Sequence, residues 1–412
     1  MNTVLDLAFA RSHFPAFSAP SLEGQAFFEN AGGSYPCRQV VDRLHEFYTR
    51  LKVQPYYCFG PSAEAGEWMD HSRVRMAEYL GVAPEEVNFG PSTSQNTYVL
   101  ASAFRGMLQP GDEVVVTNQD HEANSGAWRR LARSGITVKE WRVDPASGRL
   151  DPRQLEQLFT PRTRLLAFPH ASNLVAHINP VARITTLARA AGVATVVDGV
   201  SWAPHGMPDV AALGADAYLF SSYKTYGPHQ GVMVVRKSLL ERLPNEGHYF
   251  NEGKPTARLT PAGPDHAQQA VLRGIAEYFD ALDAHHFPGQ PEAGRPHRVR
   301  ELLRLAEIAL LEPLLEALAA RRDIRLLGPS DPHERAPTVS FLPLKVDPET
   351  VGRRLAAKGY MVGYGNFYAV RLAEAMGIDP ESGAVRVSLL HYNSPKEITG
   401  LLATLDEVLR PA

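Results

Sequence analysis

Cysteine is scarce in this sequence of 412 residues, which contains only Cys37 and Cys58. Two cysteines are too few for a disulfide framework, and their spacing is not that of a zinc or iron–sulfur site. We therefore expect no metal centre. The shortage of cysteine also favours a reducing, cytoplasmic environment.

Long apolar runs and an excess of charge of one sign are also absent. The apolar runs are short, such as Val193–Val197, and none approaches the roughly 20 residues of a membrane-spanning helix. The only apolar stretch in residues 1–20 contains Asp6 and Arg11, so a signal peptide is not expected. Lys and Arg total 42 against 45 Asp and Glu, a formal net charge of −3. This balance argues against nucleic acid or a membrane as partner.

What the sequence does contain is an alternation of short apolar runs with longer helical periods between about residues 77 and 237. Several runs are continuously apolar, which is typical of strands buried on both faces. The expected strands are Glu86–Phe89, Glu113–Thr117, Thr137–Trp141, Arg164–Phe168, Thr195–Val197, Ala217–Phe220 and Gly231–Val235. The pattern predicts an α/β fold with a doubly wound, mostly parallel seven-stranded sheet.

A turn-rich stretch from His286 to Pro296 contains three prolines and two glycines and marks a predicted domain boundary. We expect a large domain over residues 21–285, a small α+β domain over 297–412, and an N-terminal segment, 1–20, that packs with the small domain. The small domain is expected to contain helices His297–Arg322, Pro348–Lys358 and Pro395–Leu409 and strands Thr338–Phe341, Tyr360–Gly363 and Val385–Leu389.

Polar residues follow four of the predicted strands. They are His121, then His170 with Asn173, then Asp198, and finally Ser221 to Lys224. Ligands of open α/β sheets bind at the carboxyl ends of strands, so these side chains are expected to converge. Each alone has an ordinary explanation as a cap, a turn residue or a solvated charge. Together they are what pyridoxal phosphate requires: a lysine for an imine, an acid for the pyridine nitrogen and a flat partner over the ring.

A candidate phosphate site comes earlier in the chain. The stretch Gly90–Asn96 follows a predicted strand and opens a predicted helix from Thr97 to Met107. Hydroxyl groups and free backbone N–H groups at a helix start favour an anion. Ser and Thr are also ordinary helix caps, so the position before the other candidate residues is what supports this interpretation.

These pieces, with others, resemble the class V aminotransferase-fold, pyridoxal-phosphate-dependent enzymes of the cysteine desulfurase-like group. The matching motifs cover nearly the whole chain in the family's order. They are Asn30–Gly33, Gly90–Asn96, Asp120–Asn124, Ser172–Leu174 with Asn179–Pro180, Val197–Gly199, Phe220–Pro228, and Val385–Ser388 with Tyr392–Asn393. The resemblance implies the fold-type I architecture, pyridoxal 5'-phosphate as cofactor, and a homodimer with shared active sites.

The resemblance also implies a role for individual residues. Lys224 would form the imine, Asp198 would pair with the pyridine nitrogen and His121 would stack on the ring. The cofactor would further contact Ser92, Thr93 and Ser221 at the phosphate, Asn173 and Ser201 near the ring hydroxyl, and Tyr223, which replaces the family's histidine before the lysine. On the substrate side, Arg386 would clamp a carboxylate. Asn30, Gly32 and Tyr368 are also assigned to the substrate side.

The chain departs from the desulfurase pattern in one important place. Tyr368 stands where those enzymes carry a mobile-loop cysteine, and both cysteines of this chain lie near the amino terminus. Persulfide-forming desulfuration is therefore disfavoured. The stretch Ala262–His266 resembles the family's Gly-Thr phosphate contact from the neighbouring subunit but has no threonine.

The expected reaction starts with a small amino acid that exchanges onto the cofactor imine, after which Lys224 removes the Cα proton. Loss of a group from Cβ gives elimination, as in a C–S lyase, whereas reprotonation of the cofactor gives transamination. The desulfurase-like resemblance favours the lyase. Alternatives are a class V aminotransferase, a desulfurase without the usual loop cysteine, and a non-catalytic cofactor-binding protein. Tyr56, Tyr57, Tyr364, Asn366 and Tyr368 either shape an aromatic substrate pocket or serve as packing residues.

Overall fold

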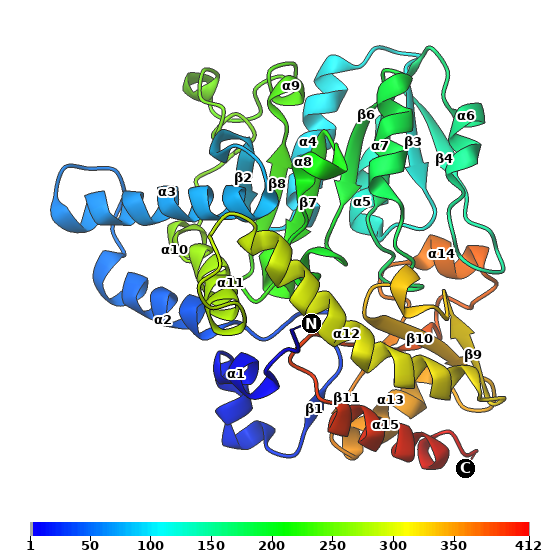
Figure 1. Ribbon diagram of the computed structural model, residues 1–412. Coiled ribbons are helices and arrows are strands. Elements are labelled where there is room, and N and C mark those ends of the chain that lie inside the picture. The colour runs from blue at the N-terminus through cyan, green and yellow to red at the C-terminus, as the bar shows by residue number, and fades with distance from the viewer. Residues whose placement is uncertain (1–2, 412) are drawn as a thin grey trace.

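The computed structural model describes residues 3–411, and its centre is a sheet of seven strands (Figure 1). Residues 1, 2 and 412, which belong to the predicted N-terminal segment and small domain, lie outside the described residues. In spatial order the strands are β2 (Val87–Gly90), β8 (Gly231–Val235), β7 (Ala217–Ser221), β6 (Ala194–Asp198), β5 (Thr163–Pro169), β3 (Glu113–Thr117) and β4 (Thr137–Trp141). Only β8 is antiparallel to its neighbours, β2 and β7. The predicted doubly wound, mostly parallel seven-stranded sheet is confirmed.

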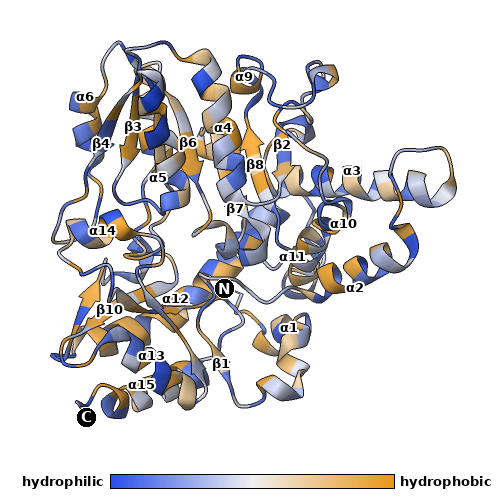
Figure 2. Ribbon diagram, turned by 180° about the vertical axis from the view of Figure 1, so that it is seen from behind, coloured by the Kyte–Doolittle hydropathy of each residue, from blue (hydrophilic) through white to orange (hydrophobic). Residues whose placement is uncertain are grey.

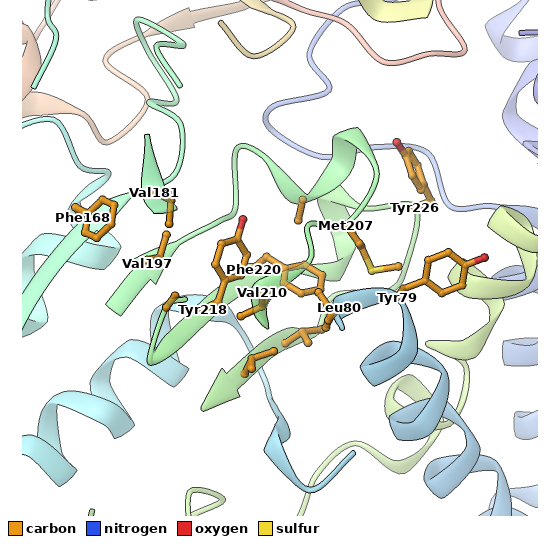
Figure 3. Close-up of a cluster of buried hydrophobic side chains, with 14 of the residues drawn as sticks. Tyr79, Leu80, Phe168, Val181, Val197, Met207, Val210, Tyr218, Phe220 and Tyr226 are labelled. Atoms are coloured by element: carbon orange, nitrogen blue, oxygen red, sulfur yellow. The ribbon is translucent and has the colours of Figure 1, made fainter. Parts of the chain in front are cut away.

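Both faces of this sheet are buried, because successive side chains of a strand point to opposite sides. On β3, Val115 belongs to one hydrophobic core, whereas Val114 and Val116 belong to another. The first core receives side chains from α3 (Gly60–Leu80), α7 (Val181–Ala190) and α11 (Arg273–His286), and Figure 3 shows part of it around Phe220 of β7. The second core receives side chains from α4 (Thr93–Met107) and α5 (Glu122–Arg129). Figure 2 accordingly shows central strands in orange, the apolar end of its scale.

The strand directions bring the predicted polar residues to one edge of the sheet. β3, β5, β6 and β7 are parallel, so their carboxyl ends lie together. His121 follows β3, Asn173 follows β5, and Asp198 is the last residue of β6. Lys224 ends a short 3₁₀ helix, Ser222–Lys224, directly after β7. The four candidate residues therefore lie at the same edge of the sheet, where ligands of open α/β sheets bind.

The C-terminal part of the chain is a smaller α+β unit, as expected. Its four-stranded sheet has the order β12 (Gly363–Gly365), β13 (Ala384–Ser388), β10 (Thr338–Pro343) and β9 (Ile324–Leu327), with every pair antiparallel. Apolar side chains from α13 (Pro348–Ala357), α15 (Pro395–Val408) and the later turns of α12 (Arg295–Ala319) pack against it.

Two details of this unit differ from the sequence expectation. The single strand predicted from Tyr360 to Gly363 is wrong, because the chain changes partners at Val362. β11 (Tyr360–Met361) runs parallel to β1 (Ala26–Phe27), and only then does β12 join β13. The strand β9 was not predicted, since Arg325 interrupts its short apolar run. Hydropathy reports burial but not the identity of a strand's partner, which here is remote in sequence.

The long helix α12 connects the two parts of the molecule (Figure 1). Its early residues Val299 and Leu303 pack in the large core, and later ones, such as Leu314, pack in the small one. The turn-rich stretch lies between the end of α11 and the start of α12, and the domain boundary there stays a prediction. The remaining helices are α1 (Leu7–Ser12), α2 (Arg38–Glu46), α6 (Leu155–Leu158), α8 (Val210–Leu213), α9 (Lys237–Leu240), α10 (His266–Ala270) and α14 (Val370–Ala375).

The N-terminal segment contacts the C-terminal part through Arg11. Its Nε donates to the Tyr392 carbonyl at 2.7 Å, and its guanidinium pairs with Glu397 of α15, also at 2.7 Å. Within residues 3–411, no helix combines the length and apolar character needed to cross a membrane.

Candidate active site

A pocket of about 490 Å³ opens at the carboxyl edge of the central sheet. It is lined by Thr93, Ser94, His121, Ala123, Pro169, Ala171, Asn173, Asp198, Val200, Ser201, Ser221, Tyr223 and Lys224. All predicted cofactor-binding residues except Ser92 are among them, together with His121. The structure therefore brings together residues that the sequence separates by more than a hundred positions.

The N-terminus of α4 borders one end of this pocket. Ser92 caps the helix, where its hydroxyl accepts a hydrogen bond from the Gln95 N–H at 3.1 Å. The Thr93 and Ser221 hydroxyl oxygens lie 2.8 Å apart and form one hydrogen bond. First-turn N–H groups and neighbouring hydroxyls make a helix start favourable for an anion. This end of the pocket is thus suited to a phosphate group.

Asp198 is held as a buried carboxylate at the end of β6. Its Oδ1 accepts from the Val200 N–H at 2.8 Å, and its carbonyl accepts from the His170 N–H at 2.7 Å. Burial raises the pKa of Asp198 to about 6, against the opposing effects of the Val200 N–H and the Lys224 charge. The carboxyl is therefore mostly ionised at neutral pH and can pair with a cation in the pocket.

Lys224 lies partly buried at the floor of the same pocket. Burial, followed by the positive charge of Arg386, lowers the pKa of Lys224 to about 8, although Asp198 and Glu29 act in the other direction. At neutral pH most of this amine is still protonated, but its neutral fraction is far larger than that of an ordinary lysine. It is therefore suited to act as a nucleophile or as a base.

His121 presents a neutral imidazole to the pocket. Burial, followed by the charges of Lys224 and Arg386, lowers the pKa of His121 to about 4. Its Nδ1 accepts from the Ala123 N–H at 3.0 Å, so the ring proton is on Nε2. The imidazole is thus available as a flat, uncharged surface.

Asn173 lines the pocket with an oxygen that lacks a partner among the described residues. Its Nδ2 donates to the Phe367 carbonyl at 2.8 Å, whereas Oδ1 is buried and makes no hydrogen bond. A buried polar atom without a partner is costly, and a ligand donor would satisfy it.

The chemistry of this donor set fits a phosphorylated pyridine aldehyde. A buried carboxylate, a lysine of lowered pKa, a neutral imidazole and an anion-binding helix start are the groups that pyridoxal phosphate requires. Asn173, which lines the pocket, adds an acceptor, because its Oδ1 has no partner among the described residues.

The four residues assigned to the substrate side lie outside this lining. Asn30 borders a smaller neighbouring cavity, which shares Lys224 with the main pocket, and its Nδ2 donates to the Ser388 carbonyl at 2.8 Å. Gly32 is exposed beside Glu29, and Arg386 is 3% exposed. Tyr368 is 70% exposed, and its ring lies 5.2 Å from that of His121.

The loop that carries Tyr368 is held in a strained conformation over the site. Phe367 and Tyr368 both have positive φ angles, 52° and 59°, a region that non-glycine residues rarely adopt. The Tyr368 carbonyl accepts from the Glu122 N–H at 2.8 Å, which ties the loop to the start of α5. The sequence resemblance predicts that this loop is the one that carries the cysteine in the desulfurases, and that correspondence stays a prediction. The two cysteines lie elsewhere: Cys37 is buried and Cys58 is exposed.

Sequence reasoning left the role of Tyr56 and Tyr57 open and missed His229. Tyr56 and Tyr57 are not among the lining residues of this pocket; Tyr56 instead packs on α3, where its hydroxyl donates to Asp70 at 3.0 Å. His229 stacks on Tyr223 with ring centroids 4.7 Å apart, and its Nδ1 lies 3.2 Å from the Pro91 carbonyl, beside the predicted phosphate loop. The sequence around His229, directly after Gly227-Pro228, contains no pattern that predicts this position beside the phosphate loop.

Comparison with known proteins agrees with this geometry. The family model described as aminotransferase class V matches residues 26–252 and 303–401, which include every residue that lines the pocket. The chain is 32% identical over 410 residues to the aminotransferase-like protein FGM3 of Gibberella zeae, with 97% of both chains covered. It is 30% identical over 411 residues to a cysteine desulfurase of Serratia proteamaculans, again with 97% of both covered.

Two further similarities are to a protein of Aspergillus flavus and to a solved structure. The cysteine desulfurase-like protein ustD of Aspergillus flavus is 29% identical over 430 residues, which cover 99% of this chain and 92% of that protein. The solved apo structure of a cysteine desulfurase from Thermococcus onnurineus matches with a TM-score of 0.85 at 24% identity, covering 99% of both chains, and shares the fold. The chain thus belongs to the class V aminotransferase family and is a pyridoxal-phosphate-dependent enzyme of fold type I, as the sequence predicts.

Proposed function

We propose that this enzyme removes the Cα proton of a small amino acid and then expels a group from Cβ, as a C–S lyase or a related β-eliminating enzyme. The observation that carries this proposal is the convergence of Lys224, Asp198 and His121 on one pocket beside the start of α4. A protein that only stored the cofactor would not need all three groups.

The residues of the pocket divide the work between binding and proton transfer. Asp198 would hold the cofactor's ring nitrogen, His121 would cover the ring, and the hydroxyls of Ser92, Thr93 and Ser221 would bind the phosphate. When bound, pyridoxal phosphate supplies an electron sink for the charge that Cα acquires when it loses its proton. Lys224 Nζ, with its pKa lowered to about 8, takes that proton as general base. Arg386 orients the substrate through its carboxylate.

Two points support elimination. Relatives at about 30% identity are named cysteine desulfurases, and their name places the reaction at a C–S bond. Tyr368, not a cysteine, occupies the loop over the site, and the side chains that line the pocket include no thiol. β-Elimination breaks a C–S bond without requiring a protein thiol to take up the sulfur.

Product analysis tests this proposal. We expect the loaded enzyme to convert L-cysteine or a cysteine sulfoxide conjugate into equal amounts of α-keto acid and ammonia, without any keto-acid acceptor. Keto acid and ammonia are measured enzymatically, and the sulfur product by chromatography. Amine transfer that strictly requires a keto-acid acceptor and releases no ammonia would identify an aminotransferase instead. Formation of alanine from cysteine would identify a desulfurase.

We also propose a homodimer with active sites completed by the neighbouring subunit. Exposed aromatic side chains, among them Tyr57 and Phe59, gather in the segment between α2 and α3, which projects from the body of the molecule (Figure 1). Isolated apolar side chains on a surface are common, but a cluster indicates an interface.

The dimer proposal predicts a specific effect of charge in this segment. Light scattering is expected to give twice the chain mass for the natural protein and the mass of one chain for Tyr57→Glu combined with Phe59→Glu. The charges would be buried without partners in an interface. Leu344→Glu, which alters an exposed apolar side chain in the small unit, serves as the control and should leave the mass unchanged. A natural protein with the mass of one chain would contradict the proposal.

A further inference from the structure

The guanidinium of Arg386 already has a carboxylate partner within the chain. Arg386 Nη2 forms an ion pair with Glu29 Oε1, Nη1 donates to the Asn173 carbonyl at 3.1 Å, and the guanidinium carbon lies 3.8 Å from the centre of the Phe367 ring. Glu29 follows β1, so this contact joins residues that are 357 positions apart. The group expected to bind the substrate carboxylate is thus neutralised from inside the protein.

The Glu29 carboxylate occupies a slot shaped by two glycines. A Cβ atom at Gly32 would lie 2.7 Å from Glu29 Oε1, and one at Gly363 would collide with Oε2. Gly363 lies opposite Arg386 in the pairing of β12 with β13, so the slot is built next to the guanidinium. A larger residue at either position would force the Glu29 carboxylate to move.

The ion pair is nevertheless incomplete. Arg386 Nε and Glu29 Oε2 are both buried and make no hydrogen bond to any described residue. A guanidinium and a carboxylate can form two parallel hydrogen bonds, and this geometry forms only one. The pair thus leaves one guanidinium N–H and one carboxylate oxygen without a partner among the described residues.

We propose that Glu29 is a specificity-determining residue, an internal carboxylate that competes with the substrate carboxylate for Arg386. This inference rests on the proposed function, because it takes Arg386 as the carboxylate-binding group. A ligand held only by its carboxylate must displace Glu29 from Arg386, and no other contact of that ligand offsets the free energy lost. An amino acid has a second anchor in its amino group and binds despite this competition. The site therefore discriminates against simple carboxylic and keto acids, and it promotes release of a keto-acid product that has lost its amino group.

Binding measurements on the loaded enzyme test this competition, with propionate as a carboxylate that lacks an amino group. We expect Glu29→Gln to bind propionate about tenfold more tightly than the natural protein, because a like charge is removed from the site. Isothermal titration calorimetry gives the dissociation constant. Propionate should also raise the melting temperature of Glu29→Gln more than that of the natural protein. Glu349→Gln, which removes the same charge from an exposed pair with Arg353 on α13, is the control and should match the natural protein.

The direction of the change separates competition from a structural role. If Glu29 only supported Arg386, its removal would weaken propionate binding, and that result or an unchanged constant would overturn the inference. Should Glu29→Gln fail to fold, Glu29→Asp provides the same test with a shorter side chain, and tighter propionate binding is again expected. Arg386→Ala separates two claims: that Arg386 binds the substrate carboxylate, and that Glu29 competes with the substrate for Arg386. If it leaves the KM for amino acids unchanged, the substrate assignment of the proposed function fails; if it raises KM while the Glu29 variants bind no more tightly, only the competition fails.

Discussion

Replacing Lys224 with alanine is expected to lower kcat by about 10²- to 10⁴-fold, the usual contribution of a general base. Its amine is the basic group whose pKa burial and Arg386 lower to about 8, and it lies in the pocket with Asp198 and His121. The variant should also lose covalent attachment of the cofactor. After borohydride treatment, the intact mass of the natural protein should include pyridoxal phosphate, whereas that of Lys224→Ala should not.

The control for this prediction is Lys237→Ala. Lys237 is an exposed lysine in α9, and its ammonium lies 3.9 Å from Glu241, so loss of this side chain changes the charge without affecting the pocket. It should retain full activity and covalent cofactor. Near-normal turnover by Lys224→Ala, or attachment of the cofactor to a different lysine, would show that the assignment is wrong.

The second large effect is expected for Asp198→Asn. The amide can still accept the hydrogen bond from the Val200 N–H, so the end of β6 should keep its conformation. The negative charge is lost, however, and removing one partner of a buried charge pair costs roughly 2–5 kcal/mol. If the lost interaction stabilises the transition state, the lower end of this free energy corresponds to a decrease in kcat of about 30-fold. Steady-state kinetics at saturating substrate and cofactor measures this directly.

Asp216, which directly precedes β7 and contacts the start of β6, provides a matched control. Asp216 Oδ2 accepts hydrogen bonds from the Thr195 N–H at 2.8 Å and the Thr195 hydroxyl at 2.9 Å, remote from the carboxyl edge. Asp216→Asn should therefore lower the melting temperature while leaving kcat nearly unchanged. The assignment of Asp198 would be refuted if its variant kept kcat within about threefold of the natural value, since that corresponds to less than 1 kcal/mol.

Much of the large sheet was predictable because its signals are local. Continuous apolar runs such as those of β3 and β6 indicate strands buried on both faces, and the helical periods between them imply parallel crossovers. Once the strands are parallel, polar residues that follow them must meet at one edge. Lys224, Asp198, His121 and Asn173 are found there for this reason.

The small unit was less predictable because its short strands take partners from distant parts of the chain. β11 pairs with β1, more than 300 residues earlier, and no local pattern at Tyr360 or Met361 indicates this. The aromatic residues Tyr56 and Tyr57 likewise gave no sign of whether they packed on α3 or lined a pocket. Packing partners of this kind depend on the path of the whole chain.

Strand periodicity in the sequence determined the fold class, and parallel topology determined that four polar residues converge on one pocket. The family and the cofactor followed from the residue types and from the resemblance of the motifs. Only the tertiary structure decided what surrounds Arg386. Glu29 is an unremarkable acidic residue in the sequence, and its contact with Arg386 exists because β1 docks against β11 and two glycines leave room for the carboxylate. Such a contact depends on side-chain reach and close backbone approach, neither of which leaves a periodic trace in the sequence.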